Sequence, residues 1–317
     1  MDARERLREL SDFAAPWAVW IAATLRLPDH LASGALTAGE LASRAGADPD
    51  ALERLLRYLV ARGVFAEADG GYSNTPVSEL LLDESGWRSW FDLDGPPGIW
   101  AESWTRLLPA VRSGSPGRDE GWYYDELART GRGAAFDAAM AMQSERDGAE
   151  MAAADDWDGV EHVVDVGGGT GALLRRLLAA RPHLRGTLFD LPQVVAGAAP
   201  ADRLAIVGGD LFGDPLPHGD VYVLSRVLHG WPDGVAAEIL ARCATAGGET
   251  AQILLVETVL REEPSADHAS FDLFMLTLVG GRERTEDDFR RLGESCGLAL
   301  RSVRQLSSGA SLLELGA

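Results

Sequence analysis

Short apolar runs separated by helical patterns dominate the second half of this 317-residue chain. From about residue 160 onward, the runs HVVDV, GTLFD, LAIVGGD, VYVLS and QILLVETV predict strands, and stretches such as AAEILARCATA predict the helices between them. Strands that alternate with helices favour a parallel sheet with right-handed crossovers. The tail, residues 298–316, predicts two more strands joined by Ser-Ser-Gly, which would add an antiparallel hairpin to the sheet.

Residues 1 to about 83 follow a different, mainly helical pattern. Thr37 and Glu40 form a capping box at the start of one helix. Asp48 and Pro49 supply an N-cap and a first-turn proline for a second helix, ALERLLRYLVARGVF. A turn at Asp-Gly-Gly followed by YSNT predicts a β-wing. The segment therefore resembles a winged helix.

The charge balance of this segment separates two functions of a winged helix. A DNA reader needs an excess of basic residues, but residues 37–82 hold seven acidic residues and four Arg. This acidic balance favours a dimerisation module. The alternative is a winged-helix regulator with a ligand-sensing domain, and binding of DNA at low salt would support that alternative. We predict three domains: a winged-helix dimerisation domain at 1–83, a helical connector and substrate-pocket region at 84–150, and a Rossmann-like catalytic domain at 151–317.

Whole-chain composition excludes several kinds of chemistry. The formal net charge of −20 disfavours nucleic-acid and anionic-membrane partners. All 29 basic residues are Arg, so a lysine Schiff base and a Walker lysine are excluded. Cys243 and Cys296 have neither metal-ligand nor disulfide-framework spacing, and no apolar run approaches the roughly 18 residues of a membrane span. We expect a cytoplasmic, metal-independent protein.

The stretch VVDVGGGTG, residues 163–171, predicts a strand, a tight glycine turn and a helix N-terminus. Such a turn lets a ligand approach bare backbone N–H groups, because no Cβ intervenes. Gly167, Gly169 and Ala172 also fit the relaxed dinucleotide fingerprint, so a nicotinamide oxidoreductase stays open at this point. Asp190 ends the next strand pattern after the glycine turn. At this spacing from the turn, a carboxylate can accept hydrogen bonds from both hydroxyls of an adenosine ribose.

Two later strand ends favour a nucleoside site of another kind. Asp210 can accept a hydrogen bond from the exocyclic amine of adenine, while Leu211 and Phe212 flank the adenine ring. The fourth strand ends in LSRVLHGWPD, which carries His229 instead of a second cofactor half-site. A histidine is suited to remove a proton near neutral pH, since its ordinary pKa is about 6.5. The alternative for His229 is a solvated or capping residue at a strand end.

Aromatic residues gather between positions 85 and 125, a density that suits a pocket for a flat ligand. Phe136 and Met140 follow on an Ala-rich helical pattern, where Met suits an adaptable apolar wall. Ordinary core packing is the alternative for each of these side chains. The tryptophans of this region are Trp87, Trp90, Trp100, Trp104 and Trp122.

Taken together, these motifs resemble the class I S-adenosylmethionine-dependent O-methyltransferases of the plant caffeate/flavonoid and bacterial antibiotic-tailoring type. The resemblance covers nearly the whole chain and rests on DVGGGTG (165–171), FDLPQVV (189–195), GDLF (209–212), LHGWPD (228–233) and DLFMLTLVGGRERTEDDF (272–289). It implies a Rossmann-like, seven-stranded doubly wound sheet with an antiparallel C-terminal hairpin. It also implies a homodimer formed through the N-terminal domain.

The resemblance assigns roles to particular residues, with S-adenosyl-L-methionine as cofactor and S-adenosyl-L-homocysteine as its product. His229 matches the general base, and Glu257 and Glu283 match the two carboxylates that bracket it. The residues expected at the cofactor are Asp165, Gly167, Gly169, Asp190, Leu191, Asp210, Leu211, Phe212, Ser225 and Arg226. Those expected at a small aromatic substrate with a phenolic or enolic hydroxyl are Trp100, Trp104, Phe136, Met140, Trp231, Phe271 and Met275.

Two positions depart from the family pattern. Many relatives have Asp directly after the histidine, where this chain has Gly230. Plant relatives place Lys four residues before the histidine, where this chain has Ser225. Some members of the family bind the cofactor without methylating, as hydroxylases, decarboxylases or pericyclases, and this alternative stays open because fold does not fix function.

Overall fold

The computed structural model describes residues 2–68, 70–119, 121–154, 157–248 and 252–316. Backbone contacts divide the chain into two compact units, residues 1–101 and residues 102–317. The three-domain division stays a prediction. Its boundary between residues 150 and 151 falls within one helix, α10 (Gly133–Ala154). Asp69, in the predicted wing turn, lies outside the described residues.

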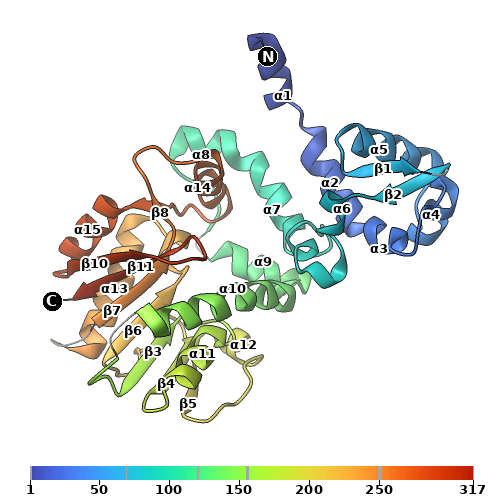
Figure 1. Cartoon of the computed structure of the whole chain (residues 1–317). Helices are drawn as coiled ribbons and strands as arrows, with labels where there is room; N and C mark the ends of the chain where they lie inside the picture. The colour runs from blue at the N-terminus through green and yellow to red at the C-terminus, as the bar shows by residue number, and fades with distance from the viewer. Residues whose placement is uncertain (1, 69, 120, 155–156, 249–251, 317) are drawn as a thin grey trace. The chain divides into compact units, whose positions relative to one another are not determined.

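The N-terminal unit is mainly helical, as predicted, and carries one β-hairpin (Figure 1). Thr37 and Glu40 form the expected capping box of α4, and Asp48 caps α5, whose first residue is Pro49. An apolar core that includes Leu41 and Leu56 joins these helices to the hairpin. The elements are α1 (Ala3–Leu10), α2 (Ala14–Thr24), α3 (Leu27–Leu31), α4 (Ala38–Ala45), α5 (Pro49–Ala61), β1 (Phe65–Ala68), β2 (Gly71–Asn74), α6 (Pro76–Glu79), and the 3₁₀ turns η1 (Asp83–Ser85) and η2 (Arg88–Trp90).

A seven-stranded mixed sheet, in the order β10-β11-β7-β6-β3-β4-β5, forms the centre of the C-terminal unit. The five strands from β7 to β5 are parallel, and β11 and β10 add the predicted antiparallel hairpin. The chain reverses direction across the sheet between β3 and β6, and such switch points bind ligands at the carboxyl ends of the strands. The strands are β3 (His162–Val166), β4 (Arg185–Asp190), β5 (Leu204–Gly208), β6 (Val221–Ser225), β7 (Gln252–Glu257), β10 (Ala299–Gln305) and β11 (Ser311–Gly316).

Helices cover both faces of this sheet, which makes it doubly wound as predicted (Figure 1). Side chains alternate between the faces along a strand. On β6, Tyr222 and Leu224 pack into the core that includes residues of α13 and α15, whereas Val223 packs into the core that includes residues of α10 and α11. From residue 97 onward, the chain forms the helices and 3₁₀ turns α7 (Pro97–Ser103), which contains residues of both units, η3 (Trp104–Arg106), α8 (Leu107–Ser113), α9 (Trp122–Thr130), α10, α11 (Ala172–Ala180), α12 (Pro192–Val195), η4 (Leu228–Gly230), α13 (Asp233–Gly247), α14 (Ala266–Leu278) and α15 (Glu286–Ser295).

One predicted strand is shorter than its apolar run. In QILLVETV, β7 ends at Glu257, and a separate strand, β8 (Val259–Leu260), pairs in parallel with β9 (Arg284–Thr285). The break brings Glu257 to the carboxyl end of the sheet and the segment around Arg284 next to it. Within the described part of the chain, the helices lack the combination of length and apolar character that a membrane span requires.

Candidate active site

The glycine turn predicted at residues 167–171 joins β3 to α11. Gly167, Gly169 and Gly171 have φ values of 67°, 62° and 77°, a conformation that residues with a Cβ rarely adopt. A Cβ at Gly168 would lie 2.5 Å from the Asp165 carboxylate, so that position also requires glycine. The turn therefore presents bare backbone, a surface that can lie close to a nucleoside cofactor.

Asp190, at the end of β4, holds this turn in place. Its Oδ2 accepts a hydrogen bond from the Gly169 N–H (2.7 Å), and its Oδ1 accepts one from the Leu191 N–H (2.7 Å). Burial raises the pKa of Asp190 to about 6, against the opposing effect of these two N–H groups. Each carboxylate oxygen keeps a second lone pair, so the residue fits the predicted role at a ribose.

Asp165 lies deeper, beneath Gly168, and is fully buried. Neither of its carboxylate oxygens has a hydrogen-bond partner among the described residues. Burial, with a smaller effect of Asp190, raises the pKa of Asp165 to about 7. Its contact with the cofactor stays a prediction.

The residues predicted at the adenine lie on the loop after β5. The exposed Asp210 accepts a hydrogen bond from the Phe212 N–H through Oδ1 (3.0 Å), and Leu211 and Phe212 are half-buried. The ring of Phe212 packs edge-on against Trp231, with 5.0 Å between ring centroids. The loop predicted to hold the adenine is therefore in contact with the loop that carries His229.

Ser225 and Arg226 lie at the carboxyl end of β6. The Ser225 Oγ is buried without a hydrogen-bond partner among the described residues, so it remains available to a ligand. Arg226 adopts a left-handed conformation (φ 54°) and forms an ion pair with Asp147 of α10, which is fully buried. The bare glycine turn and this unpaired hydroxyl are both features that fit the predicted cofactor.

His229 lies on η4, and two buried glutamates face the same nitrogen of its ring. Its Nδ1 is 2.9 Å from Glu283 Oε1 and 3.8 Å from Glu257 Oε2. Glu257 Oε1 in turn accepts a hydrogen bond from the Leu228 N–H (2.8 Å). An imidazole that donates from Nδ1 to a carboxylate has its lone pair on Nε2, the form required of a general base.

Burial and charge act in opposite directions on this cluster. Burial lowers the pKa of His229, but Glu257 and Glu283 outweigh it, so the pKa of His229 is raised above its ordinary value. Burial also raises the pKa of Glu257, although His229 opposes it. Neither Glu257 Oε2 nor Glu283 Oε2 has a hydrogen-bond partner among the described residues.

Aromatic side chains extend from His229 along α14. Phe271 lies 5.9 Å from the imidazole and 5.8 Å from Phe274, which stacks with Trp104 at 6.1 Å, all measured between ring centroids. These contacts bring the predicted residues Trp104 and Phe271 into one chain of rings beside the candidate base. Such a wall suits a flat apolar ligand.

The other residues predicted at the substrate are more dispersed. Phe136 packs edge-on against Tyr123 at 5.4 Å, Met140 is half-buried, and Met275 is buried. Trp100 belongs to the N-terminal unit, where it packs against Trp90 at 5.7 Å. Substrate contact stays a prediction for these four residues.

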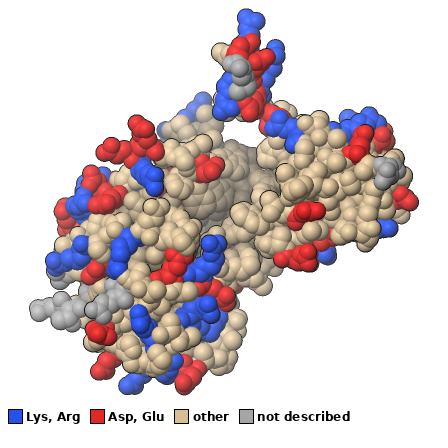
Figure 2. Space-filling view, viewed as in Figure 1, with Lys and Arg blue, Asp and Glu red and all other residues tan. Residues whose placement is uncertain are grey.

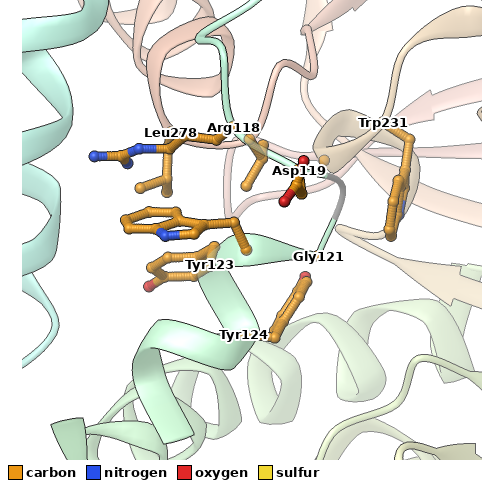
Figure 3. Close-up of a pocket in the computed structure, with 10 residues that line it drawn as sticks. Arg118, Asp119, Gly121, Tyr123, Tyr124, Trp231 and Leu278 are labelled. Carbon is orange, nitrogen blue, oxygen red and sulfur yellow. The ribbon is translucent and has the colours of Figure 1, made fainter. Parts of the chain in front are cut away.

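A pocket is lined in part by the two residues that follow His229 in the chain (Figure 3). Gly230 and Trp231 line it from the loop after β6, and Tyr124 lines it from α9. Tyr124 is 40% exposed, so its side chain is accessible to a ligand in this pocket.

Sequence reasoning missed several residues of this site. Asp272 accepts a hydrogen bond from the Glu283 N–H (2.8 Å), and Arg284 bonds to the carbonyls of Leu228 and Trp231. Asp272 and Arg284 both occur in a motif quoted for the resemblance, but their roles depend on contacts across the fold. Tyr124 lies in the tryptophan-rich segment and carries no spacing signal.

Comparison with known proteins agrees with this geometry. The O-methyltransferase domain family matches residues 122–299, and the O-methyltransferase dimerisation domain matches residues 7–84. The 2,7-dihydroxy-5-methyl-1-naphthoate 7-O-methyltransferase of Streptomyces carzinostaticus is 41% identical, over 98% of this chain and 97% of that protein. The aclacinomycin 10-hydroxylase of Streptomyces purpurascens is 38% identical, over 97% of this chain and 87% of that protein.

Among solved structures, the O-methyltransferase of neocarzinostatin biosynthesis, in complex with S-adenosylmethionine and 2-hydroxy-5-methyl naphthoic acid, superposes with a TM-score of 0.89. It is 39% identical, with 98% of each chain covered. The chain belongs to the O-methyltransferase family. It is an S-adenosylmethionine-dependent O-methyltransferase.

Proposed function

We propose that the enzyme methylates a phenolic or enolic hydroxyl of an aromatic natural product, with His229 as the general base. The observation that carries this proposal is the 2.9 Å contact between His229 Nδ1 and Glu283 Oε1, at a strand end beside the glycine turn. The stacked rings of Trp104, Phe271 and Phe274 support an aromatic acceptor. Relatives named for naphthoate and 3-amino-4-hydroxybenzoate substrates support it as well.

His229 removes the hydroxyl proton of the acceptor. A phenol has an ordinary pKa of about 10, so a base near neutral pH makes the attacking oxygen more nucleophilic. Glu283 fixes the imidazole so that Nε2 faces the acceptor as a base, and the two carboxylates stabilise the imidazolium that forms. S-adenosylmethionine, when bound, supplies an activated methyl group on a sulfonium, so the residues of this chain mainly align and deprotonate the acceptor.

The cofactor residues divide into three groups, which lie after β3, at the end of β4 and after β5. Gly167 and Gly169 present backbone to the methionine part, while Asp190 accepts the ribose hydroxyls through lone pairs that Gly169 and Leu191 leave free. Asp210 and Leu211 receive the adenine. Calorimetric titration with S-adenosylmethionine, S-adenosylhomocysteine and NADH tests this site. The proposal requires that the first two compounds bind and that NADH does not.

The N-terminal unit forms a homodimer in this proposal. A dimerisation-domain family matches it, and several large apolar side chains of α1 and α2 are exposed. Leu7 and Leu10 are 67% and 68% exposed, and Phe13, just before α2, is 82% exposed. Exposed apolar patches on soluble proteins mark contact sites. The side of the molecule in Figure 2 carries acidic and basic groups side by side, without the continuous basic stripe of a DNA reader.

Hydroxylation with the same cofactor is the second candidate function, because one relative at 38% identity is a hydroxylase. Incubation with S-adenosylmethionine, hydroxylated naphthoic acids, dissolved oxygen and a thiol reductant separates the two, because hydroxylation requires an oxygen source and electrons as well as the acceptor. Methylation gives a product heavier by one methylene and an equal amount of S-adenosylhomocysteine. Hydroxylation would leave the cofactor unchanged, and that outcome would overturn our proposal.

A further inference from the structure

Arg284 is buried deep in the catalytic unit, although arginine is almost never fully buried without partners. Its Nη1 donates a hydrogen bond to the Leu228 carbonyl (2.7 Å) and its Nη2 to the Trp231 carbonyl (2.8 Å). Its Nε donates to Asp233 Oδ1 (3.0 Å). One guanidinium therefore binds the loop of His229 on both sides of the histidine and at the start of α13.

The main chain next to Arg284 contacts the same loop. The Arg282 N–H donates a hydrogen bond to the His229 carbonyl (2.9 Å). A Cβ at Gly281 would lie 2.0 Å from that carbonyl oxygen, so the backbones touch where glycine alone fits. Residues 281–284 thus bind His229 through its carbonyl, through its ring by way of Glu283, and through its neighbours by way of Arg284.

The chemistry of these contacts requires arginine. A guanidinium presents five N–H donors in a planar fork, whereas a lysine ammonium is a point charge that cannot span two carbonyls and a carboxylate in this arrangement. Arg284 also lowers the pKa of Glu257, in opposition to the larger effect of burial. The charged groups that act on His229 itself are Glu257, Glu283 and Arg226.

We propose that Arg284 is a positioning residue for the methyl transfer. Arg284 fixes the loop of His229, so that Nδ1 of the imidazole stays bonded to Glu283 and Nε2 stays at the acceptor hydroxyl. This inference rests on the proposed function of His229. A base must be held within about 0.5 Å of its working position, and a displacement of about 1 Å can cost roughly 10²-fold in rate.

The test compares Arg284→Lys and Arg284→Gln with the wild-type enzyme. The first readout, which needs no acceptor, is the NMR resonance of the His229 Nδ1–H, assigned by its loss in His229→Gln. We expect this proton to exchange with water at least about tenfold faster in both variants, because the loop opens locally. Binding of S-adenosylhomocysteine, measured by calorimetry, should stay unchanged, since Arg284 bonds to no residue of the glycine turn.

The second readout is turnover of an acceptor that the wild type methylates. We expect kcat to fall by roughly 10²-fold in Arg284→Lys while KM changes little. In a His229→Ala background the same substitution should cause no further loss. Arg290→Lys, on an exposed ion pair of α15, is the matched control and should behave as wild type.

Two results would overturn the inference. One is a lower melting temperature with wild-type proton exchange and kcat, which is what a purely structural arginine would give. The other is an equal fall in kcat with and without His229. If the Arg284 variants do not fold, Asp233→Ala removes the acceptor of the Arg284 Nε hydrogen bond and should give the same changes at smaller size, and wild-type behaviour would count against us. Full activity of His229→Ala would instead refute the proposed base.

Discussion

His229 and Glu283 are 54 positions apart in the chain, yet the imidazole Nδ1 lies 2.9 Å from the carboxylate Oε1. The contact forms because η4 follows β6 while Glu283 precedes β9, which pairs with β8 just beyond the end of β7. A buried carboxylate at this distance selects one tautomer of the imidazole and stabilises its charged form. Both effects lead to predictions for kcat and for its dependence on pH.

Replacement of His229 by alanine should lower kcat by roughly 10²–10⁴-fold, the usual contribution of a general base. Affinity for S-adenosylhomocysteine should stay close to wild type, because the ring lies outside the glycine turn and the Asp190 contacts. Steady-state kinetics and calorimetry on the same preparation measure both quantities. Near-wild-type turnover would show that proximity to the cofactor suffices for catalysis.

The dependence of kcat on pH should show an acidic limb above the ordinary histidine pKa of about 6.5. The two carboxylates favour the imidazolium and outweigh burial, so the pKa of His229 is raised and the basic form appears only at higher pH. Activity should therefore increase as pH rises through this pKa.

Glu283→Gln tests the same assignment from the partner. Loss of one negative charge should lower the pKa of His229, so the acidic limb should move to lower pH even though the maximal rate falls. A pH–rate profile of each enzyme provides the measurement. A limb that stays in place in the variant would show that another group titrates there.

Asp190→Ala should weaken binding of S-adenosylhomocysteine by roughly tenfold to a hundredfold, because hydrogen bonds to a charged group contribute about 1.5–3 kcal/mol. Part of the loss comes from the freed Gly169 N–H, whose bond to Asp190 shapes the turn. Calorimetric titration measures the change, with Asp202→Ala on the exposed surface as the control. Unchanged affinity would mean that the ribose lies elsewhere.

Sequence reasoning predicted the sheet well because its signal is local. Apolar runs and glycine punctuation define β3, β4 and β6, and the order of strands and helices then constrains the topology. The glycine turn and Asp190 were predicted for the same reason, since each lies where a strand ends. Arg284 was not predicted, because its three bonds go to residues more than 50 positions earlier, and nothing in the letters GGRERT indicates them.

Two glycines near His229 give opposite expectations for the same substitution. A Cβ built on Gly230 meets no atom within 4 Å, and the φ of Gly230 is not positive, so alanine fits its backbone conformation. Gly230→Ala should therefore leave the free energy of unfolding nearly unchanged. A Cβ on Gly281 would lie 2.0 Å from the His229 carbonyl oxygen and 2.6 Å from the Gly230 carbonyl carbon. Gly281→Ala should therefore destabilise the protein by roughly 1–3 kcal/mol, the usual cost of overpacking.

Activity should separate the pair as well. Gly281→Ala pushes on the carbonyl of the base itself, so kcat should fall in the folded fraction, whereas Gly230→Ala should alter mainly which acceptors fit, because Gly230 lines a pocket. Urea unfolding and kinetics with a set of hydroxylated naphthoic acids measure the two effects. Equal stability and equal kcat in both variants would mean that the loop of His229 yields without cost, and the close contact between residues 281 and 229 would then have no part in holding the base.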